Sequence, residues 1–398
     1  MVAVYAGLLL LAGCKQVDIP VEDLEPTVVY DWMAGESPIP NKRMGILRGG
    51  LNDEEHAVGP DGIYFIPPMT NDSEDYVSVS DDSFILFAEH GSNALIKLCG
   101  RADCTHDNVQ CDAYLYRGSE LSYYGGYLYA VSGEGPHSQE TKLVRMASNG
   151  RLHETVLDLL QFAKSHGGDF VYCDMITDGY CLFSTHYWKE TESGLVGERL
   201  QSYKYKLDGS MRKPEMMEFG VAYQCGDVVL SISNEIRDDN DYRSCWNLDL
   251  ETNTRTYLAE HPRIPGWFGD KEAYYFRDGA IVRLTYATGK EEVMANTDLD
   301  GRYYAFVFPD CIVLASRDDS AEADNHLYFY NWAFELVDTV EIAYPHSCRA
   351  EFLIIAESAE RIVLTDRAAD GTPKYYIEKS ELGTGNAKVY QYDLSAVS

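Results

Sequence analysis

The chain has 398 residues, of which 45% are hydrophobic and 12% aromatic, and its formal net charge is −31. This much apolar material supplies a sizeable core, and the 30 tyrosines favour strands over helices, which argues against a disordered protein. The negative charge repels phosphate backbones, whose binding needs clustered Lys and Arg, and so argues against nucleic acid as a partner.

The amino terminus starts with a short apolar run, Val2 to Leu11, which leads into Leu-Ala-Gly-Cys at positions 11–14 and then into polar chain. The run is too short to cross a bilayer and is typical of a secretory signal. The four residues resemble the lipobox of bacterial lipoproteins. This resemblance implies that Cys14 carries a lipid that anchors the mature protein to the cell membrane, outside the cytoplasm. The alternatives are an ordinary signal or a buried strand that contains Cys14.

The rest of the chain divides near position 26. Residues 15–26 are acidic and flanked by proline, a composition typical of a tether between an anchor and a domain. The sequence therefore predicts a lipoprotein signal segment at 1–14, a tether at 15–26 and one β domain at 27–398.

The β domain is built from a repeated unit whose clearest copy is Gly125 to Leu157. It contains an aromatic strand at 126–131, an alternating strand at 142–147, a Ser-Asn-Gly turn at 148–150 and a closing strand at 152–157. Asn-Gly between alternating runs is a strong hairpin signal, because both turn positions tolerate positive φ.

The first strand of this unit recurs seven times. Units of four strands at such a spacing are typical of the blades of a β-propeller. The sequence predicts an all-β fold, a single β-propeller of seven blades, with six or eight blades as alternatives. The seven copies begin at Gly62, Gly126, Gly179, Asp227, Glu272, Asp310 and Glu360.

The last unit is short of a strand, because only six residues follow Tyr392. An early segment must then supply that strand, and residues 26–32 are the obvious candidate. We therefore expect the ring to be closed by an N-terminal strand, which would remove two exposed sheet edges.

Three cysteines and a histidine lie within thirteen residues: Cys99, Cys104, His106 and Cys111. Three thiolates and one imidazole form a complete tetrahedral zinc set of the closed, structural kind. The alternative is one disulfide among the three cysteines with a spare thiol. We expect the cluster to replace the turn after the third strand of the first unit, on the face opposite the long loops. No other cofactor is indicated.

The run Leu-Cys-x4-Cys-x-His-x4-Cys at 98–111, followed by Asp-Ala-Tyr, resembles a motif of uncharacterised TolB-like β-propeller lipoproteins of Gram-positive gut anaerobes. Members often have proline where this chain has Ala102. The resemblance covers the lipobox, this motif and loosely the repeats. It implies an anchored surface protein with a propeller fold and no established activity.

Two further local predictions concern the middle of the chain. An amphipathic helix is expected around Leu157 to Lys164, where Leu159, Leu160 and Ala163 share a face with Val156. Cys173 and Cys181 lie symmetrically about a turn at 177–178 and should face each other, either as a cross-strand disulfide or as two buried thiols.

Long loops are expected after the second strand of most units, and such loops gather on the binding face of a repeat protein. Tyr187, Trp188, Trp267 and Phe268 are the aromatic candidates for that face. The expected long loops span residues 67–93, 132–140, 184–200, 233–243, 316–325 and 366–382.

Functionally, the sequence predicts a membrane-anchored extracytoplasmic propeller that acts as a binding module for a protein or carbohydrate ligand. No Gly-x-Ser-x-Gly, His-Glu-x-x-His or phosphate-binding loop motif occurs in it. The alternatives are a secreted carbohydrate- or peptide-active propeller enzyme, whose carboxylates would converge from distant loops, and an accessory subunit of a transport system.

Overall fold

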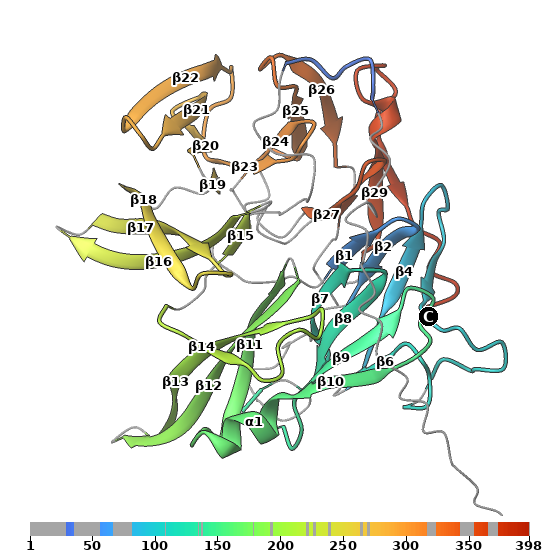
Figure 1. Cartoon of the computed structure of the whole chain (residues 1–398). Helices are drawn as coiled ribbons and strands as arrows, with labels where there is room; N and C mark the ends of the chain where they lie inside the picture. The colour runs from blue at the N-terminus through green and yellow to red at the C-terminus, as the bar shows by residue number, and fades with distance from the viewer. Residues whose placement is uncertain are drawn as a thin grey trace, which may run out of the picture.

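The computed structural model describes the greater part of the β domain (Figure 1). Cys14, the predicted signal segment and the predicted tether lie outside the described residues. The described residues are 29–35, 56–66, 82–107, 109–133, 135–136, 138–177, 179–191, 194–219, 223–225, 228–237, 240–262, 266–268, 271–316, 324–342, 354–364 and 373–397.

Seven four-stranded antiparallel sheets account for most of these residues, and we number them 1 to 7 in chain order. Sheet 1 consists of β1 (His56–Gly59), β2 (Gly62–Phe65), β4 (Leu86–Glu89) and β5 (Leu95–Lys97). Sheet 2 consists of β7 (Ser119–Tyr124), β8 (Tyr127–Ser132), β9 (Lys142–Ala147) and β10 (Glu154–Asp158). Sheet 3 consists of β11 (Phe170–Thr177), β12 (Tyr180–Thr191), β13 (Gly194–Lys206) and β14 (Glu215–Met217).

Sheets 4 to 7 follow the same plan. Sheet 4 consists of β15 (Tyr223–Cys225), β16 (Val228–Arg237), β17 (Asn240–Asp249) and β18 (Thr254–Pro262), and sheet 5 of β19 (Gly266–Phe268), β20 (Glu272–Arg277), β21 (Ala280–Thr285) and β22 (Lys290–Asn296). Sheet 6 consists of β23 (Tyr303–Val307), β24 (Ile312–Ser316), β25 (His326–Tyr330) and β26 (Leu336–Glu341). Sheet 7 consists of β27 (Ile354–Glu357), β28 (Arg361–Leu364), β29 (Tyr375–Glu378) and β30 (Val389–Gln391).

Four short elements complete the described structure. β3 (Asp82–Phe84) pairs with β6 (Tyr114–Tyr116) as a separate two-stranded sheet. The helix α1 (Leu159–Ser165) joins sheets 2 and 3, and a 3₁₀ turn, η2 (Lys379–Glu381), follows β29. Among the described residues, no helix is long and apolar enough to cross a membrane.

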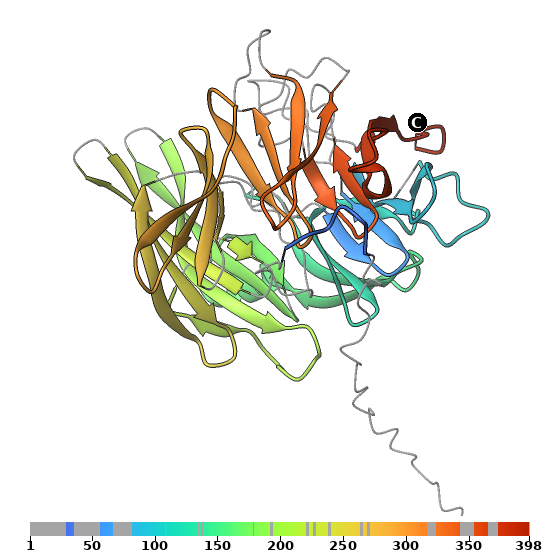
Figure 2. The same cartoon turned by 90° about the horizontal axis from the view of Figure 1, so that it is seen from above.

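The sheets follow one another around a common centre in chain order, which is the arrangement of a β-propeller (Figures 1 and 2). Sheets 7 and 1 are packed together as well, because Val363 and Tyr376 share a buried cluster with Ile63 and Leu95. The all-β propeller architecture expected from the sequence is confirmed at this level.

The unbroken apolar strands are explained by burial on both faces. In β23, Tyr303 and Ala305 pack toward sheet 5, whereas Tyr304 and Phe306 pack toward sheet 7. A strand between two neighbouring layers needs apolar residues at odd and even positions alike. This is why such strands show no clear alternation in the sequence.

The predicted closing strand is wrong. Residues 29–35 form turns, with no strand among them, and residues 26–28 lie outside the described residues. The fourth strand of sheet 7 is β30, because β29 already supplies the third strand. The sequence pattern predicts a long loop at 366–382, where β29 lies. The chain end is instead held by two backbone bonds, from Leu95 to Asp393 (3.1 Å) and from Asp393 to Asn93 (2.7 Å).

The segment 29–35 lies beside sheets 6 and 7, where Figures 1 and 2 show it in dark blue. The indole of Trp32 donates a hydrogen bond to the Lys379 carbonyl (2.9 Å), and the Tyr30 hydroxyl donates to the Ala359 carbonyl (3.0 Å). The backbone N–H of Ala333 donates to Ala34 (2.8 Å). The segment therefore contacts two sheets without extending either ladder.

The predicted helix is confirmed as α1. Asp158 caps its N-terminus by accepting a hydrogen bond from the N–H of Gln161 (2.8 Å). Leu159, Leu160 and Ala163 are buried, as the helical spacing predicted. The helix forms because its apolar face packs against the Cys173 and Phe183 face of sheet 3.

Candidate functional site

The Cys and His cluster lies in the connection between β5 and β6. The sequence pattern predicts a position after the third strand of the first unit, but β5 is the fourth strand of sheet 1 and β4 is the third. Lys97, at the end of β5, pairs with Leu86, at the start of β4. The cluster therefore emerges at the end of sheet 1 where the β2–β4 connection also lies, and the expectation that it faces away from the long loops is wrong.

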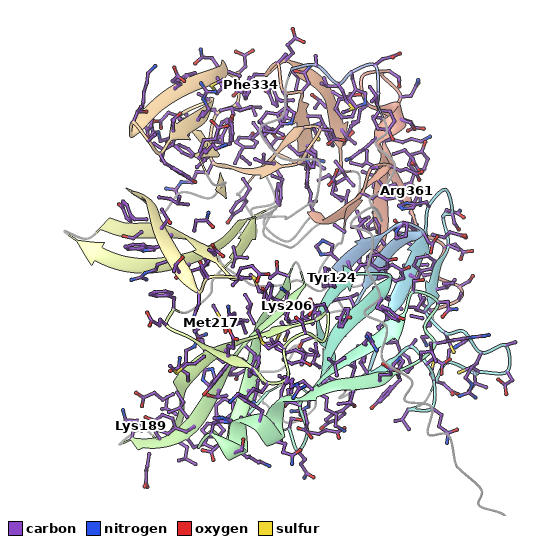
Figure 3. All side chains as sticks on the ribbon, viewed as in Figure 1. Tyr124, Lys189, Lys206, Met217, Phe334 and Arg361 are labelled. Atoms are coloured by element: carbon purple, nitrogen blue, oxygen red, sulfur yellow. The ribbon has the colours of Figure 1, made fainter. Side chains whose placement is uncertain are left out.

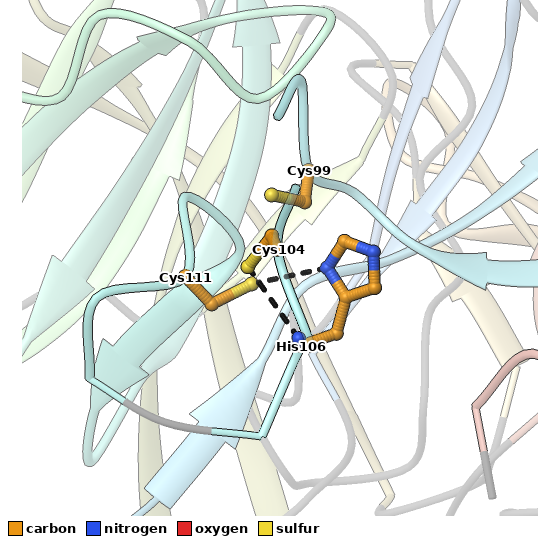
Figure 4. Close-up of side chains that lie close together, drawn as sticks. All are labelled: Cys99, Cys104, His106 and Cys111. Atoms are coloured by element: carbon orange, nitrogen blue, oxygen red, sulfur yellow. Dashed lines mark hydrogen bonds between the residues drawn. The ribbon is translucent and has the colours of Figure 1, made fainter. Parts of the chain in front are cut away.

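The four side chains converge on one point (Figure 4). One ligand atom from each of Cys99, Cys104, His106 and Cys111 lies within 4.8 Å of the others. The Sγ of Cys111 is 3.6 Å from Nδ1 of His106. Tetrahedral zinc, with bonds of about 2.3 Å to sulfur and about 2.0 Å to nitrogen, places a sulfur and a nitrogen ligand about 3.5 Å apart. The residues present fit such an ion.

Backbone N–H groups point at the three sulfur atoms with a regular spacing. The N–H of His106 donates to Sγ of Cys104 at 3.4 Å. Cys99 accepts from the N–H of Arg101, and Cys111 accepts from the N–H of Ala113. Each sulfur thus bonds to the residue two positions ahead. Such bonds orient thiolate ligands and offset part of their charge.

The thiol pKa values reflect this environment. Burial tends to raise the pKa of Cys99, but the N–H groups of Arg101 and Asp112 outweigh it and the net shift is downward. Burial raises the pKa of Cys111 to about 12, because that side chain lies deepest in the cluster. A bound divalent metal ion would hold all three sulfur atoms as thiolates.

Three cationic side chains hold the loop that carries these ligands. Lys97 Nζ donates to the His106 carbonyl (2.9 Å), and Arg151 Nε donates to the Gly100 carbonyl (3.0 Å). Arg101 donates to the Gln110 carbonyl (2.6 Å). A zinc ion with three thiolates and a neutral imidazole carries one net negative charge, so these cations also favour it electrostatically.

The cluster can therefore bind a metal ion, and its donor set is compatible with structural zinc. All three cysteines are free thiols in the structure. Cys173 and Cys181 are buried with their sulfur atoms 3.9 Å apart, too far for a disulfide between them, which corresponds to the thiol-pair alternative.

The four aromatic residues predicted for the binding face lie in two strands, β12 and β19, and not in loops. Residues 184–191 and 194–200 continue β12 and β13 as one long hairpin. Trp188 lies in β12 against Phe170, with ring centres 4.9 Å apart, whereas the neighbouring Tyr187 donates to Glu198 (2.8 Å). Trp267 and Phe268 lie in β19, the first strand of sheet 5, and their side chains lie outside those described.

Trp188 belongs to a second cluster that the sequence analysis missed. Phe170 stacks on His186 at 5.2 Å, and Tyr172 meets His186 edge-on at 5.1 Å. Beneath these rings, Arg199 donates to Oδ1 of Asp174 (2.7 Å). We call Asp174, Ser184, His186, Arg199, Phe170, Tyr172 and Trp188 the sheet 3 cluster.

Burial strongly shifts the pKa values of two polar residues in the sheet 3 cluster. Burial raises the pKa of Asp174 to about 6, against the opposing effect of Arg199 and Ser184. Burial, with the nearby charge of Arg199, lowers the pKa of His186 to about 4. Carboxyl groups with such shifts occur preferentially at functional sites. No sequence motif marks these residues, because they are distant neighbours on three strands.

Comparison with known proteins gives no family assignment. No protein-family model matches the chain, and no curated protein matches its sequence.

Several solved structures are similar to the chain in fold. One is the acylaminoacyl peptidase of Pyrococcus horikoshii, with 9% identity and a TM-score of 0.49 over 86% of this chain and 53% of that one. Another is the β-propeller domain of the Trilobed protease from Pyrococcus furiosus, with 10% identity and a TM-score of 0.41 over 71% of this chain and 82% of that one. A third is TolB from Acinetobacter baumannii, with 11% identity and a TM-score of 0.32 over 70% of this chain and 62% of that one. The chain spans about half the length of the peptidase. At these identities the likeness concerns the fold alone.

Proposed function

We propose that the chain is a lipid-anchored, extracytoplasmic β-propeller that serves as a binding module, with a structural zinc ion in the Cys99 to Cys111 cluster. In this proposal each four-stranded sheet is one blade of a seven-bladed ring. The observation that carries the zinc part of the proposal is the closed ligand set, in which four protein atoms converge and three sulfur atoms each accept a backbone N–H.

A closed zinc site stabilises a fold and leaves no coordination position for a substrate. Here the site fastens the connection between sheets 1 and 2, since Cys111 lies in the same buried cluster as Leu98, Leu128 and Met146. The proposed role of the metal is therefore to hold a rigid scaffold. Binding would fall to the side chains at the ends of the strands.

Metal analysis tests the zinc ion. Protein purified without oxygen should contain about one zinc ion per chain, and Cys104→Ser and His106→Ala should each lose it. Cys173→Ala, which removes a buried thiol outside the cluster, is the matched control and should keep it. A wild-type protein without zinc, together with a mapped disulfide among Cys99, Cys104 and Cys111, would overturn the metal assignment.

Mass spectrometry of the mature N-terminus tests the anchor. Support for it comes from Leu-Ala-Gly-Cys at 11–14, which resembles a lipobox. The membrane fraction should contain a chain that starts at a lipid-modified Cys14, and Cys14→Ser should release the protein from the membrane. An unmodified Cys14 in soluble wild-type protein would contradict the anchor and would leave the zinc assignment untouched.

A further inference from the structure

The β12–β13 hairpin is the longest in the described structure, with strands of 12 and 13 residues. It extends sheet 3 well past the neighbouring β11, and Figure 3 shows Lys189 at its far end. Phe170 pairs with His186, Tyr172 pairs with Ser184, and Arg199 pairs with His186. These paired residues lie on one face of the sheet.

This face changes character along its length. Met175 and Leu182 are buried with Leu248 of sheet 4. Farther along the hairpin, 39% of Tyr172 and 42% of the Arg199 side chain are exposed. The aromatic and ionic part of the face is therefore accessible to a ligand, whereas the apolar part joins the two sheets.

Two shifts in the strand register bring together Asp174 and Arg199, the two charged residues of the cluster. In β11, Cys173 and Met175 stand opposite successive residues of β12, so that Asp174 is an extra residue. In β13, Arg199 and Gln201 stand opposite successive residues of β12, so that Leu200 is extra. Bulges redirect side chains and occur often beside functional sites. Here Asp174 and Arg199 meet at 2.7 Å.

The bulge at Leu200 distinguishes sheet 3 from the other sheets. In the described parts of the other six sheets, the ladder between the second and third strands has no shift in register. The fold of a blade therefore does not require this bulge. Its effect in sheet 3 is to bring a guanidinium group to a buried carboxylate.

One atom of the cluster lacks a partner within the described structure. Asp174 is only 6% exposed, and its Oδ1 accepts from Arg199 and from Ser184 (3.2 Å). Its Oδ2 is buried without a hydrogen bond. Buried polar atoms are nearly always paired, and an orphan calls for an explanation such as a ligand group. A hydroxyl donor from a ligand would satisfy it.

The polar groups next to Asp174 can both donate and accept hydrogen bonds. Ser184 Oγ lies 3.0 Å from Nε2 of His186, and the partly exposed Arg199 can donate further bonds. Asp174 and Arg199 offset each other's charge, and the chain as a whole carries −31, which disfavours an anion. The cluster is suited to an uncharged ligand rich in hydroxyl groups.

We propose that the sheet 3 cluster binds a neutral saccharide. The C–H face of a sugar ring would pack on the aromatic rings of Trp188 and Tyr172, while its hydroxyl groups donate to Asp174 and accept from Arg199. This inference rests on the proposed role as a binding module and names the ligand class of that module. The sheet 3 cluster itself is defined by geometry that is independent of the zinc ion and the anchor.

The test is calorimetric titration with a panel of uncharged oligosaccharides derived from β-glucan, mannan, xylan and chitin. Wild-type protein should bind at least one of them. Trp188→Ala and Asp174→Asn should each weaken that binding at least tenfold. Tyr257→Ala is the matched control, because Tyr257 is an aromatic residue of sheet 4 that is 48% exposed. It should bind like the wild type.

Zinc content and melting temperature are measured for every variant, so that misfolding is recognised. If Trp188→Ala does not fold, Tyr172→Ala replaces it, because that ring is already 39% exposed. Failure of the wild type to bind any member of the panel at millimolar concentration overturns the saccharide assignment. Binding that survives both variants shows a binding module whose site lies elsewhere. Binding of an aromatic peptide in place of the sugars would assign the rings to a protein partner.

Discussion

The Cys99 to Cys111 cluster and the sheet 3 cluster are both concentrations of chemically active side chains on a β scaffold, but they differ in how their polar atoms are paired. In the first, the four ligand atoms face one another and the surrounding N–H groups face the sulfur atoms. In the second, a buried oxygen of Asp174 lacks a partner within the described structure, and the adjoining Arg199 is 42% exposed.

In the two proposals above, this difference separates a stabilising site from a binding site. A closed cluster gains nothing from a further ligand, so its removal should change stability. The sheet 3 cluster has a buried oxygen without a hydrogen bond in the described structure and a partly exposed Tyr172 ring, so its alteration should change binding as well as stability. The next three predictions test that contrast in order of expected size.

The largest effect is expected when zinc is lost from the first cluster. A metal ion present at about a thousandfold its Kd stabilises the folded state by about 4 kcal/mol. Cys104→Ser should therefore lower the free energy of unfolding by roughly that amount, measured by urea titration at pH 7.5. Addition of a chelator to the wild type should reproduce the loss, and the variant should not respond to the chelator. A variant as stable as the wild type would show that the cluster is no structural zinc site.

A smaller effect is expected from protonation within the sheet 3 cluster. The pKa of Asp174 is raised to about 6 from an unfolded value of about 3.9. Its contribution to stability is therefore fully present below about pH 4 and is lost as the pH rises through 6. Because Asp174 is only 6% exposed, this contribution is about 3 kcal/mol.

His186 acts in the opposite direction, because its pKa is lowered to about 4 from an unfolded value of about 6.5. Its stabilising contribution appears as the pH rises from 4 to 6.5. Compared with the wild type, His186→Gln should lose stability over this range as the pH rises, and Asp174→Asn should gain it. Melting temperatures of the three proteins provide the measurement. All three proteins share any effect of zinc release in acid, so the differences between their melting temperatures exclude it. If the melting temperatures of the three proteins changed equally with pH, that result would contradict the burial of both groups.

The smallest effect on stability is expected at Gly197, which pairs with Trp188 across the hairpin. A Cβ at this position would lie 2.7 Å from the Phe170 ring, so that ring must move. Gly197→Ala should cost about 1 kcal/mol, the lower end of the usual cost of overpacking, because the contact is with the end of a side chain, and it should weaken saccharide binding several-fold. Val196→Ala is the control, because Val196 is 47% exposed and pairs with Lys189 instead. Unchanged binding in Gly197→Ala would show that Phe170 does not position Trp188.

Much of the architecture was predictable from local sequence. The Gly126 strand, the Asn149-Gly150 turn and the helix at Leu159 have strong local signals, and the structure contains β8, the β9–β10 turn and α1 at these positions. The strand β7 was missed, because Leu121 is the single aliphatic residue among its six. The strand β4 (Leu86–Glu89) was missed because it has only four residues, and this error placed the cysteine cluster after the wrong strand.

The two clusters also differ in how close together their residues lie in the sequence. Cys99, Cys104, His106 and Cys111 lie within thirteen residues, so the chain itself brings the ligands together, and the sequence alone identified the set. Asp174, His186 and Arg199 lie on three different strands, and two bulges decide that they meet. A bulge depends on which residues pair across a ladder, and composition and periodicity carry little information about such pairing. The sequence by itself determined the strand-rich fold and the set of Cys and His side chains that can hold a metal ion. Only the tertiary structure decided how residues 29–35 and Asp393 are held and which side chains form the sheet 3 cluster.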